Sequence, residues 1–106
     1  MDKITYIRAD HTDWSIGADG TMTVKDTESN WFFPLNPVAT LIWDLMDGAN
    51  SVDDMVVVIC EEFDIDVATA RDDITDFVEQ ALDLNLAEEH VRVIDAQRNL
   101  GAQPVS

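Results

Sequence analysis

The residues that could carry nucleophilic chemistry are few and lie far apart in the sequence. The chain has two histidines, His11 and His90, and a single cysteine, Cys60. Neither histidine has a serine or cysteine beside it in the sequence to serve as an activated nucleophile. Cys60 ends the apolar run MVVVIC, so it cannot form an intrachain disulfide, and we expect a small buried hydrophobic side chain in a reducing compartment.

Carboxylates are the other candidates for chemistry. Asp72 and Asp76 share a predicted helix face, but no apolar pocket is indicated that would raise the pKa of one of them for acid–base work. The sequence has no CxxC or HExxH spacing and no calcium-loop pattern around its Asp-Gly pairs. We therefore predict that the protein is not an enzyme and that it binds no metal and no cofactor.

The charge is strongly negative and unevenly distributed. The formal net charge is −16, and residues 36–90 contain fifteen acidic residues against one basic residue, Arg71. Such a surface repels nucleic acids and anionic membranes, because binding to them depends on Lys and Arg. Two interpretations stay open: a solvated surface that favours solubility or tolerance of salt, and attraction of a basic partner.

Length and hydropathy indicate one domain with its own core. A chain of 106 residues is long enough to fold without disulfides or metals. The longest apolar run has six residues, which is too short for a signal peptide or a membrane span. We expect a soluble cytoplasmic protein.

Three short strands are predicted before any helix. Alternating apolar residues flank Asp19-Gly20, a pair that favours a hairpin turn. The stretch NWFFPL then predicts a third strand, in which alternate side chains share a face. Trp31, Phe33 and Leu35 are expected on one face of that strand, and Phe32 on the other.

Three helices follow, and each has a start signal. Asn36 is a good N-cap before Pro37, and Gly48 is the expected C′ stop of the first helix. Ser51 with Asp54 predicts a capping box for the second helix, and Asp66 caps the third. We divide the chain into a lead-in at 1–12, a domain at 13–90 and a flexible tail at 91–106.

This order predicts an α+β fold similar to a winged helix-turn-helix, with a three-stranded antiparallel sheet followed by three helices. A DNA-reading third helix would expose basic or amide side chains, which contact base edges. The predicted third helix instead exposes acidic residues, so we expect no nucleic-acid partner: Asp72, Asp73, Asp76, Glu79 and Asp83.

The stretch from Trp14 to Glu89 resembles the PqqD family, the RiPP recognition elements that bind leader peptides in natural product biosynthesis. Phe33 stands two residues before Leu35-Asn36, and the segments TLIWDLMDG and SVDDM follow, with NL at the end of the last helix. The sequence departs from the family pattern at Pro34, and at Asn85, where glycine is common.

The resemblance implies a non-catalytic peptide-binding protein, a peptide chaperone that captures the leader of a ribosomally synthesised precursor peptide. The leader would add as a strand beside the third strand, with its apolar side chains in a groove against the third helix. A separate modifying enzyme, such as a radical SAM protein, a protease or a cyclase, would act on the core peptide. The residues implied to bind the peptide are Asn30, Trp31, Phe32, Phe33, Arg71, Ile74, Thr75, Val78 and Leu82.

Pro34 and Arg71 affect how a leader peptide is expected to bind. Pro34 has no N–H, so main-chain pairing with an added strand should end at Phe33. Arg71 could pair with an acidic residue of the leader, or it could only relieve repulsion between Asp72 and Asp73. A competing hypothesis is a scaffold or regulatory winged-helix domain that binds a folded protein through its acidic face.

Overall fold

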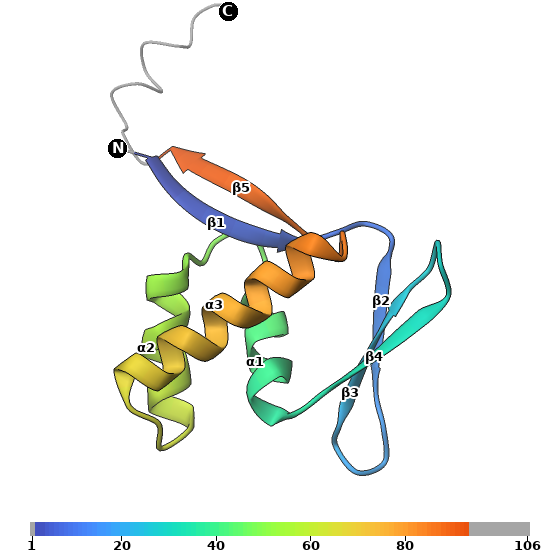
Figure 1. Cartoon of the computed structure of the whole chain (residues 1–106), viewed down its shortest axis with the longest axis horizontal. Helices are drawn as coiled ribbons and strands as arrows, with labels where there is room; N and C mark the ends of the chain where they lie inside the picture. Colours follow the sequence, from blue (N-terminus) through green and yellow to red (C-terminus); the bar gives the residue numbers. More distant parts are fainter. Residues whose placement is uncertain (1, 94–106) are drawn as a thin grey trace, which may run out of the picture.

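The computed structural model describes residues 2–93 of the chain, with side chains described for residues 4–90. Within this range the chain forms five strands and three helices (Figure 1). No helix in this range is long and apolar enough to cross a membrane. The elements are, in order, β1 (Asp2–Arg8), β2 (Thr12–Ile16), β3 (Met22–Asp26), β4 (Trp31–Leu35), α1 (Pro37–Leu45), α2 (Val52–Glu62), α3 (Val67–Asp83) and β5 (Ala87–Val93).

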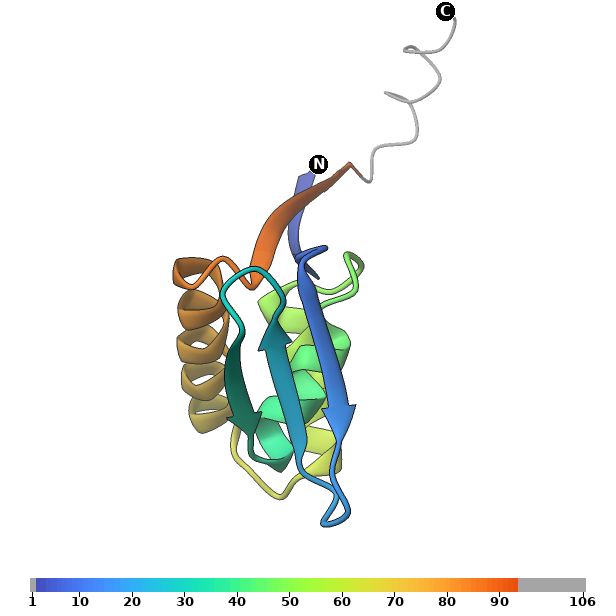
Figure 2. The same cartoon turned by 90° about the vertical axis from the view of Figure 1, so that its right-hand side faces the viewer.

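Strands β2, β3 and β4 form the predicted three-stranded antiparallel sheet, with β3 in the centre. The β2–β3 turn contains Gly20 at φ 85°, a conformation that glycine adopts without steric cost. One face of the sheet packs on the helices, and β4 is the strand that lies on the side of α3 (Figure 2). The fold class expected from the sequence is confirmed.

The helix starts also match the sequence signals. The side chain of Asn36 accepts a hydrogen bond from the N–H of Ala39, and Ser51 and Asp54 form a complete capping box. The end of α1 differs from the prediction. The helix stops at Leu45 with Met46 as its C-cap, so Gly48, at φ 90°, belongs to the following turn and is not C′.

Both ends of the domain were misjudged from the sequence. Residues expected in the lead-in form β1, which pairs antiparallel with β5 in a second sheet that crosses the predicted boundary at residue 90. Thr5 is fully buried, and its hydroxyl oxygen lies 2.9 Å from the carbonyl of Gly48 and 2.7 Å from that of His90. The two carbonyls share its one donated proton, which fixes this sheet to the α1–α2 turn. His90 therefore lies in a strand. The tail at 94–106 lies outside the described residues.

The core fills the space between the three-stranded sheet and the helices. Its largest fully buried side chain is Trp43 on α1. The sheet contributes Met22, Val24 and Leu35, which share one face through the register of β3 and β4. The helices contribute mainly Ile42, Trp43, Met46, Met55, Val56, Ile59, Ala70, Ile74, Val78 and Ala81.

The cap of α3 makes a prediction for acid stability. The backbone N–H of Thr69 donates to the Asp66 carboxylate at 2.7 Å, and this bond lowers the pKa of Asp66 below its usual 3.8. A lowered pKa means that the charged cap stabilises the fold above pH 3.8 and that this contribution disappears as the pH falls through the lowered value. Asp66→Asn keeps a capping oxygen without the charge. We expect its melting temperature to lie below that of the wild type at pH 7 and the difference to vanish towards pH 2.

Thermal melts between pH 7 and pH 2 measure this difference. Asp72→Asn is the matched control, because it removes the same charge from an exposed position of the same helix. A melting-temperature difference between Asp66→Asn and the wild type that stays constant with pH would contradict the assignment.

Candidate functional site

The hydrogen bonds around β2 and β3 show whether each residue of the central strand β3 pairs its main-chain groups with β2 or with β4. Thr27 donates its N–H to the carbonyl of His11 at one end of the hairpin. Gly17 donates its N–H to the carbonyl of Thr21 at the other end. Because successive residues of an antiparallel strand bond alternately to its two neighbours, the odd-numbered residues of β3 bond β2 and the even-numbered ones bond β4.

This alternation defines what β4 offers at its free edge. Val24 stands opposite Phe33, so Phe33 bonds inward and its neighbours Phe32 and Pro34 turn their main-chain groups outward. Phe32 presents both an N–H and a carbonyl at the edge, whereas Pro34 presents only a carbonyl. Proline is tolerated at such an outward position because no ladder bond is lost there.

At the opposite edge of the same sheet, two outward N–H groups already have acceptors. On β2 the residues that face outward include Thr12 and Trp14. Thr12 donates its N–H to the carbonyl of Ala9, and Trp14 donates its N–H to the carboxylate of Asp13. We therefore take the edge of β4 as the candidate for the addition of a further strand.

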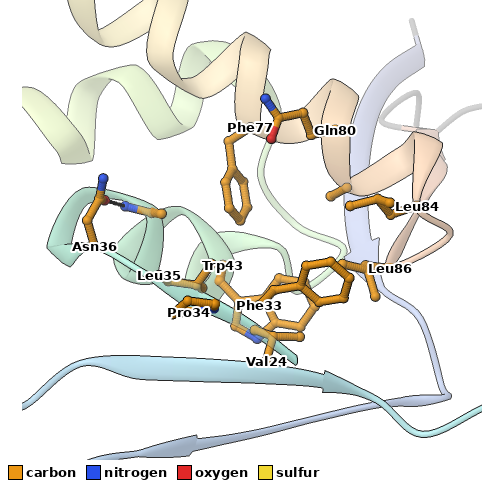
Figure 3. A pocket seen from close by; sticks show the side chains of 12 residues that line it. Val24, Phe33, Pro34, Leu35, Asn36, Trp43, Phe77, Gln80, Leu84 and Leu86 are labelled. Carbon is orange, nitrogen blue, oxygen red and sulfur yellow. Dashed lines mark hydrogen bonds between the residues drawn. The ribbon is translucent and has the colours of Figure 1, made fainter. Parts of the chain in front are cut away.

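An apolar cavity of about 260 Å³ adjoins β4. It opens between β4, the start of α1 and the second half of α3, and Figure 3 shows Phe77 projecting from α3 into this space. Leu84, which is 47% exposed, stands at the end of α3 on the rim. The lining residues are Val24, Phe33, Pro34, Leu35, Asn36, Ala39, Trp43, Phe77, Gln80, Ala81, Leu84 and Leu86.

Trp43 brings an unused hydrogen-bond donor to this cavity. The residue is 1% exposed, and its indole Nε1–H has no acceptor among the described residues. Its ring packs edge-to-face with Trp14, with centroids 5.7 Å apart, and the guanidinium of Arg8 lies 4.8 Å from the Trp14 ring centroid. A buried donor without an acceptor is costly, so a ligand carbonyl that reached Nε1 would be stabilised.

The residues predicted on β4 lie where an added strand would contact them. Phe33 lines the cavity, while Trp31 and Phe32 are exposed on opposite faces of the strand. Lys25 lies over the ring of Phe32 at 5.5 Å. Asn30 adopts φ 63° in the turn just before the strand.

The residues predicted on the helix do not line the cavity, so their part in peptide binding stays a prediction. Ile74 and Val78 are buried in the core, and Thr75 and Leu82 are half-buried without lining the cavity. Arg71 forms an ion pair with Asp53 of α2, with Nη1 and Oδ1 2.7 Å apart, so that flank of α3 faces α2. The buried face of α3 is bordered by exposed residues on two sides. Arg71 lies on the side that faces α2, and the residues that line the cavity lie on the side that faces β4.

The cavity is also lined by three side chains that the sequence analysis did not include: Phe77, Gln80 and Leu84. They are spaced three and four residues apart, which places them on one face of the helix. Phe77 and Ala81 were visible as members of the apolar face of the helix. Gln80 and Leu84 carried no such signal, because their role depends on which flank meets β4.

Away from the cavity, the described residues include one group of possible metal ligands. His11, Asp26 and Glu28 have ligand atoms within 4.8 Å of one another. The carboxylate of Asp26 accepts hydrogen bonds from the backbone N–H groups of Glu28 and Ser29, and the bond from Glu28 is the main cause of a lowered Asp26 pKa. Exposed acidic groups commonly lie this close without an ion. None of the three residues lines the cavity.

The region that contains β3, β4 and all three helices identifies the family. A model of the family described as coenzyme PQQ synthesis protein D (PqqD) matches residues 22–87, more than half of the chain. The chain belongs to the PqqD family. The resemblance found in the sequence is thereby confirmed, and the matched region of this PqqD protein includes every lining residue of the cavity.

Two solved structures share the fold of this PqqD protein. One is TbiB1 in complex with the TbiA(beta) leader peptide, with a TM-score of 0.68 and 23% identity, over 77% of this chain and 94% of that chain. The other is lasso peptide synthetase B1 complexed with the leader peptide, with a TM-score of 0.69 and 20% identity, over 78% and 96%. Among curated proteins none matches the sequence.

Proposed function

We propose that this PqqD protein is a non-catalytic recognition module that captures the leader of a ribosomally synthesised precursor peptide by adding it as a strand to β4. The observation that carries the proposal is the open edge of β4 directly beside an apolar cavity. Main-chain pairing supplies affinity that is independent of sequence, and the cavity selects an apolar side chain. The two solved structures of the same fold, both complexed with leader peptides, support this function.

The expected register follows from the free groups of β4. Phe32 can give and accept one main-chain hydrogen bond, and Pro34 can only accept. The ladder therefore has a single donor on this side and ends with the carbonyl of Pro34, one residue beyond the limit at Phe33 that the sequence led us to expect. A leader that continues past this point must be held by side chains.

The benefit of such a module is effective concentration. Holding the leader keeps the core peptide close to the active site of a separate modifying enzyme, which raises its local concentration without new contacts. A radical SAM protein, a protease or a cyclase could fill that role.

Titration calorimetry with the leader half of a short precursor peptide encoded near this gene tests the proposal. We expect binding that persists at about 0.5 M salt, because apolar anchors and main-chain pairing are screened far less than exposed charges. Phe32→Pro removes the single edge donor and should weaken binding roughly three- to ten-fold, the value of one net hydrogen bond. Phe32→Ala is the matched control, because it removes the same side chain and keeps the N–H.

Equal affinities for Phe32→Pro and Phe32→Ala would show that the peptide does not pair with β4. Binding that collapses at high salt would instead favour the competing scaffold function, in which a partner docks on the acidic face. No binding at either salt concentration would also contradict leader capture.

A further inference from the structure

A second hollow of about 270 Å³ continues the cavity beside β4. The two share Asn36, Ala39, Phe77 and Gln80 in their walls, so one peptide could pass through both. No residue of β4 lines the second hollow, which lies between α1 and the middle of α3. It therefore receives whatever part of a bound peptide has left the edge of β4.

The second hollow differs from the first in its charge. Asp73 and Asp76 of α3 line it, both are exposed, and three residues of separation put them on one side of the helix. Neither carboxylate has an ion-pair or hydrogen-bond partner among the described residues.

The cations of the described domain are engaged elsewhere. Arg71, the one basic residue at 36–90, pairs with Asp53 on the other flank of α3. Arg8 donates to the carbonyls of Trp43 and Asp44 at the end of α1. No cation with a described side chain lines the second hollow, so a cationic group of a ligand would meet these two carboxylates without competition from the described residues.

Few main-chain groups are available at this point. Pro34 has no N–H, and the next residue outward, Asn36, already uses its side chain to cap α1 and its carbonyl to accept from Thr40. Recognition of the peptide there depends mainly on side chains. In the adjoining cavity the Nε1–H of Trp43 has no acceptor among the described residues, so a ligand carbonyl that reached it would be stabilised.

We infer that the leader carries a lysine or arginine within about four residues of its apolar anchor, and that this cation binds Asp73 and Asp76. The spacing follows from the continuity of the two hollows and an advance of roughly 3.3 Å per residue in an extended chain. The inference rests on the proposed function and adds a specificity to it. The net charge of −16 attracts such a peptide from a distance.

Selection from a display library of random 20-residue peptides tests this inference without knowledge of the natural leader. Wild-type protein should enrich peptides with an apolar anchor and with Lys or Arg at a fixed spacing from it. Asp73→Asn/Asp76→Asn should keep the anchor and lose the basic preference. Asp72→Asn/Asp83→Asn is the matched control, because it removes two exposed carboxylates of the same helix that do not line either hollow, and it should behave as the wild type.

A titration then gives the size of the effect. Replacing the enriched basic residue of a selected peptide by glutamine should weaken binding to the wild type about five-fold, as expected for a partly exposed ion pair, and should leave binding to Asp73→Asn/Asp76→Asn unchanged. Enrichment of apolar anchors with no basic preference would overturn this inference and leave leader capture standing. No enrichment of any peptide would overturn both.

Discussion

Replacing Leu84 by aspartate is expected to weaken leader binding by roughly 30-fold or more while the domain stays folded. Leu84 lines the cavity beside β4 and is 47% exposed in the free protein, so its side chain becomes buried only when a ligand covers it. An apolar anchor placed against an aspartate there would desolvate a carboxylate without a partner, which costs about 2 kcal/mol or more. The free protein does not bear this cost.

The fold should tolerate the change because Leu84 contributes to α3 mainly through its backbone. It is the C-cap of the helix, and its N–H bonds the carbonyl of Gln80. A negative charge at a helix C-terminus is unfavourable by about 0.3–1 kcal/mol, which is a small loss for a folded domain. Circular dichroism and the melting temperature check this directly.

Val57→Asp is the matched control for binding. Val57 is 58% exposed on α2 and does not line the cavity, and the variant has the same net charge as Leu84→Asp. Titration calorimetry with one leader peptide compares the two. If both variants bind that peptide with equal affinity, the cavity is not the peptide site.

Local signals explain why so much of the fold was predictable. Asn36, Ser51 and Asp66 each cap a helix through contacts made within three residues, so the sequence alone contains the whole interaction. The hairpin at Gly20 is local in the same sense. Strand β4 was predictable because its aromatic stretch is bounded by a turn before it and by the cap of α1 after it.

The second sheet was not predictable because its partners come from the two ends of the domain. The bond from Thr5 to the carbonyl of His90 spans 85 residues, and the β1–β5 register is set by pairing that no local pattern encodes. Strand β5 begins at Ala87, directly after the positive φ of Asn85 ends α3. The domain boundary predicted at residue 90 therefore falls inside a strand.

The predicted strand residue Phe33 lines the cavity, whereas the predicted helix residues do not, and there is one reason for the difference. Periodicity identifies the buried stripe of α3, but the residues on either side of that stripe have similar composition. Which side of this face meets β4 depends on how α3 packs against the sheet. That packing is set by tertiary contacts and not by the local sequence. Arg71 marks the flank towards α2, whereas Phe77 and Leu84 mark the flank towards β4.

The burial of Val78 changes the outcome expected for Val78→Asp. If Val78 lined the peptide groove, this substitution would abolish peptide binding and leave the domain folded. Val78 is instead 3% exposed and lies in the core. A carboxylate there has no cationic partner, so we expect a loss of about 3–5 kcal/mol in the free energy of unfolding, a large share of the stability of a small domain. Urea denaturation followed by circular dichroism measures this loss.

Val67→Asp is the control for this prediction, because it makes the same substitution at an exposed position in the first turn of α3. Val67 is 57% exposed, and a negative charge near a helix N-terminus is favourable, so its stability should equal or slightly exceed that of the wild type. Desolvation should raise the pKa of the new carboxyl at position 78 above that of an ordinary aspartate. The loss should therefore shrink as the pH falls through that raised value, whereas the neutral variant Val78→Asn should show no such dependence. If Val78→Asp is as stable as Val67→Asp, position 78 is exposed, and α3 presents to β4 the flank that contains Arg71, Thr75 and Leu82.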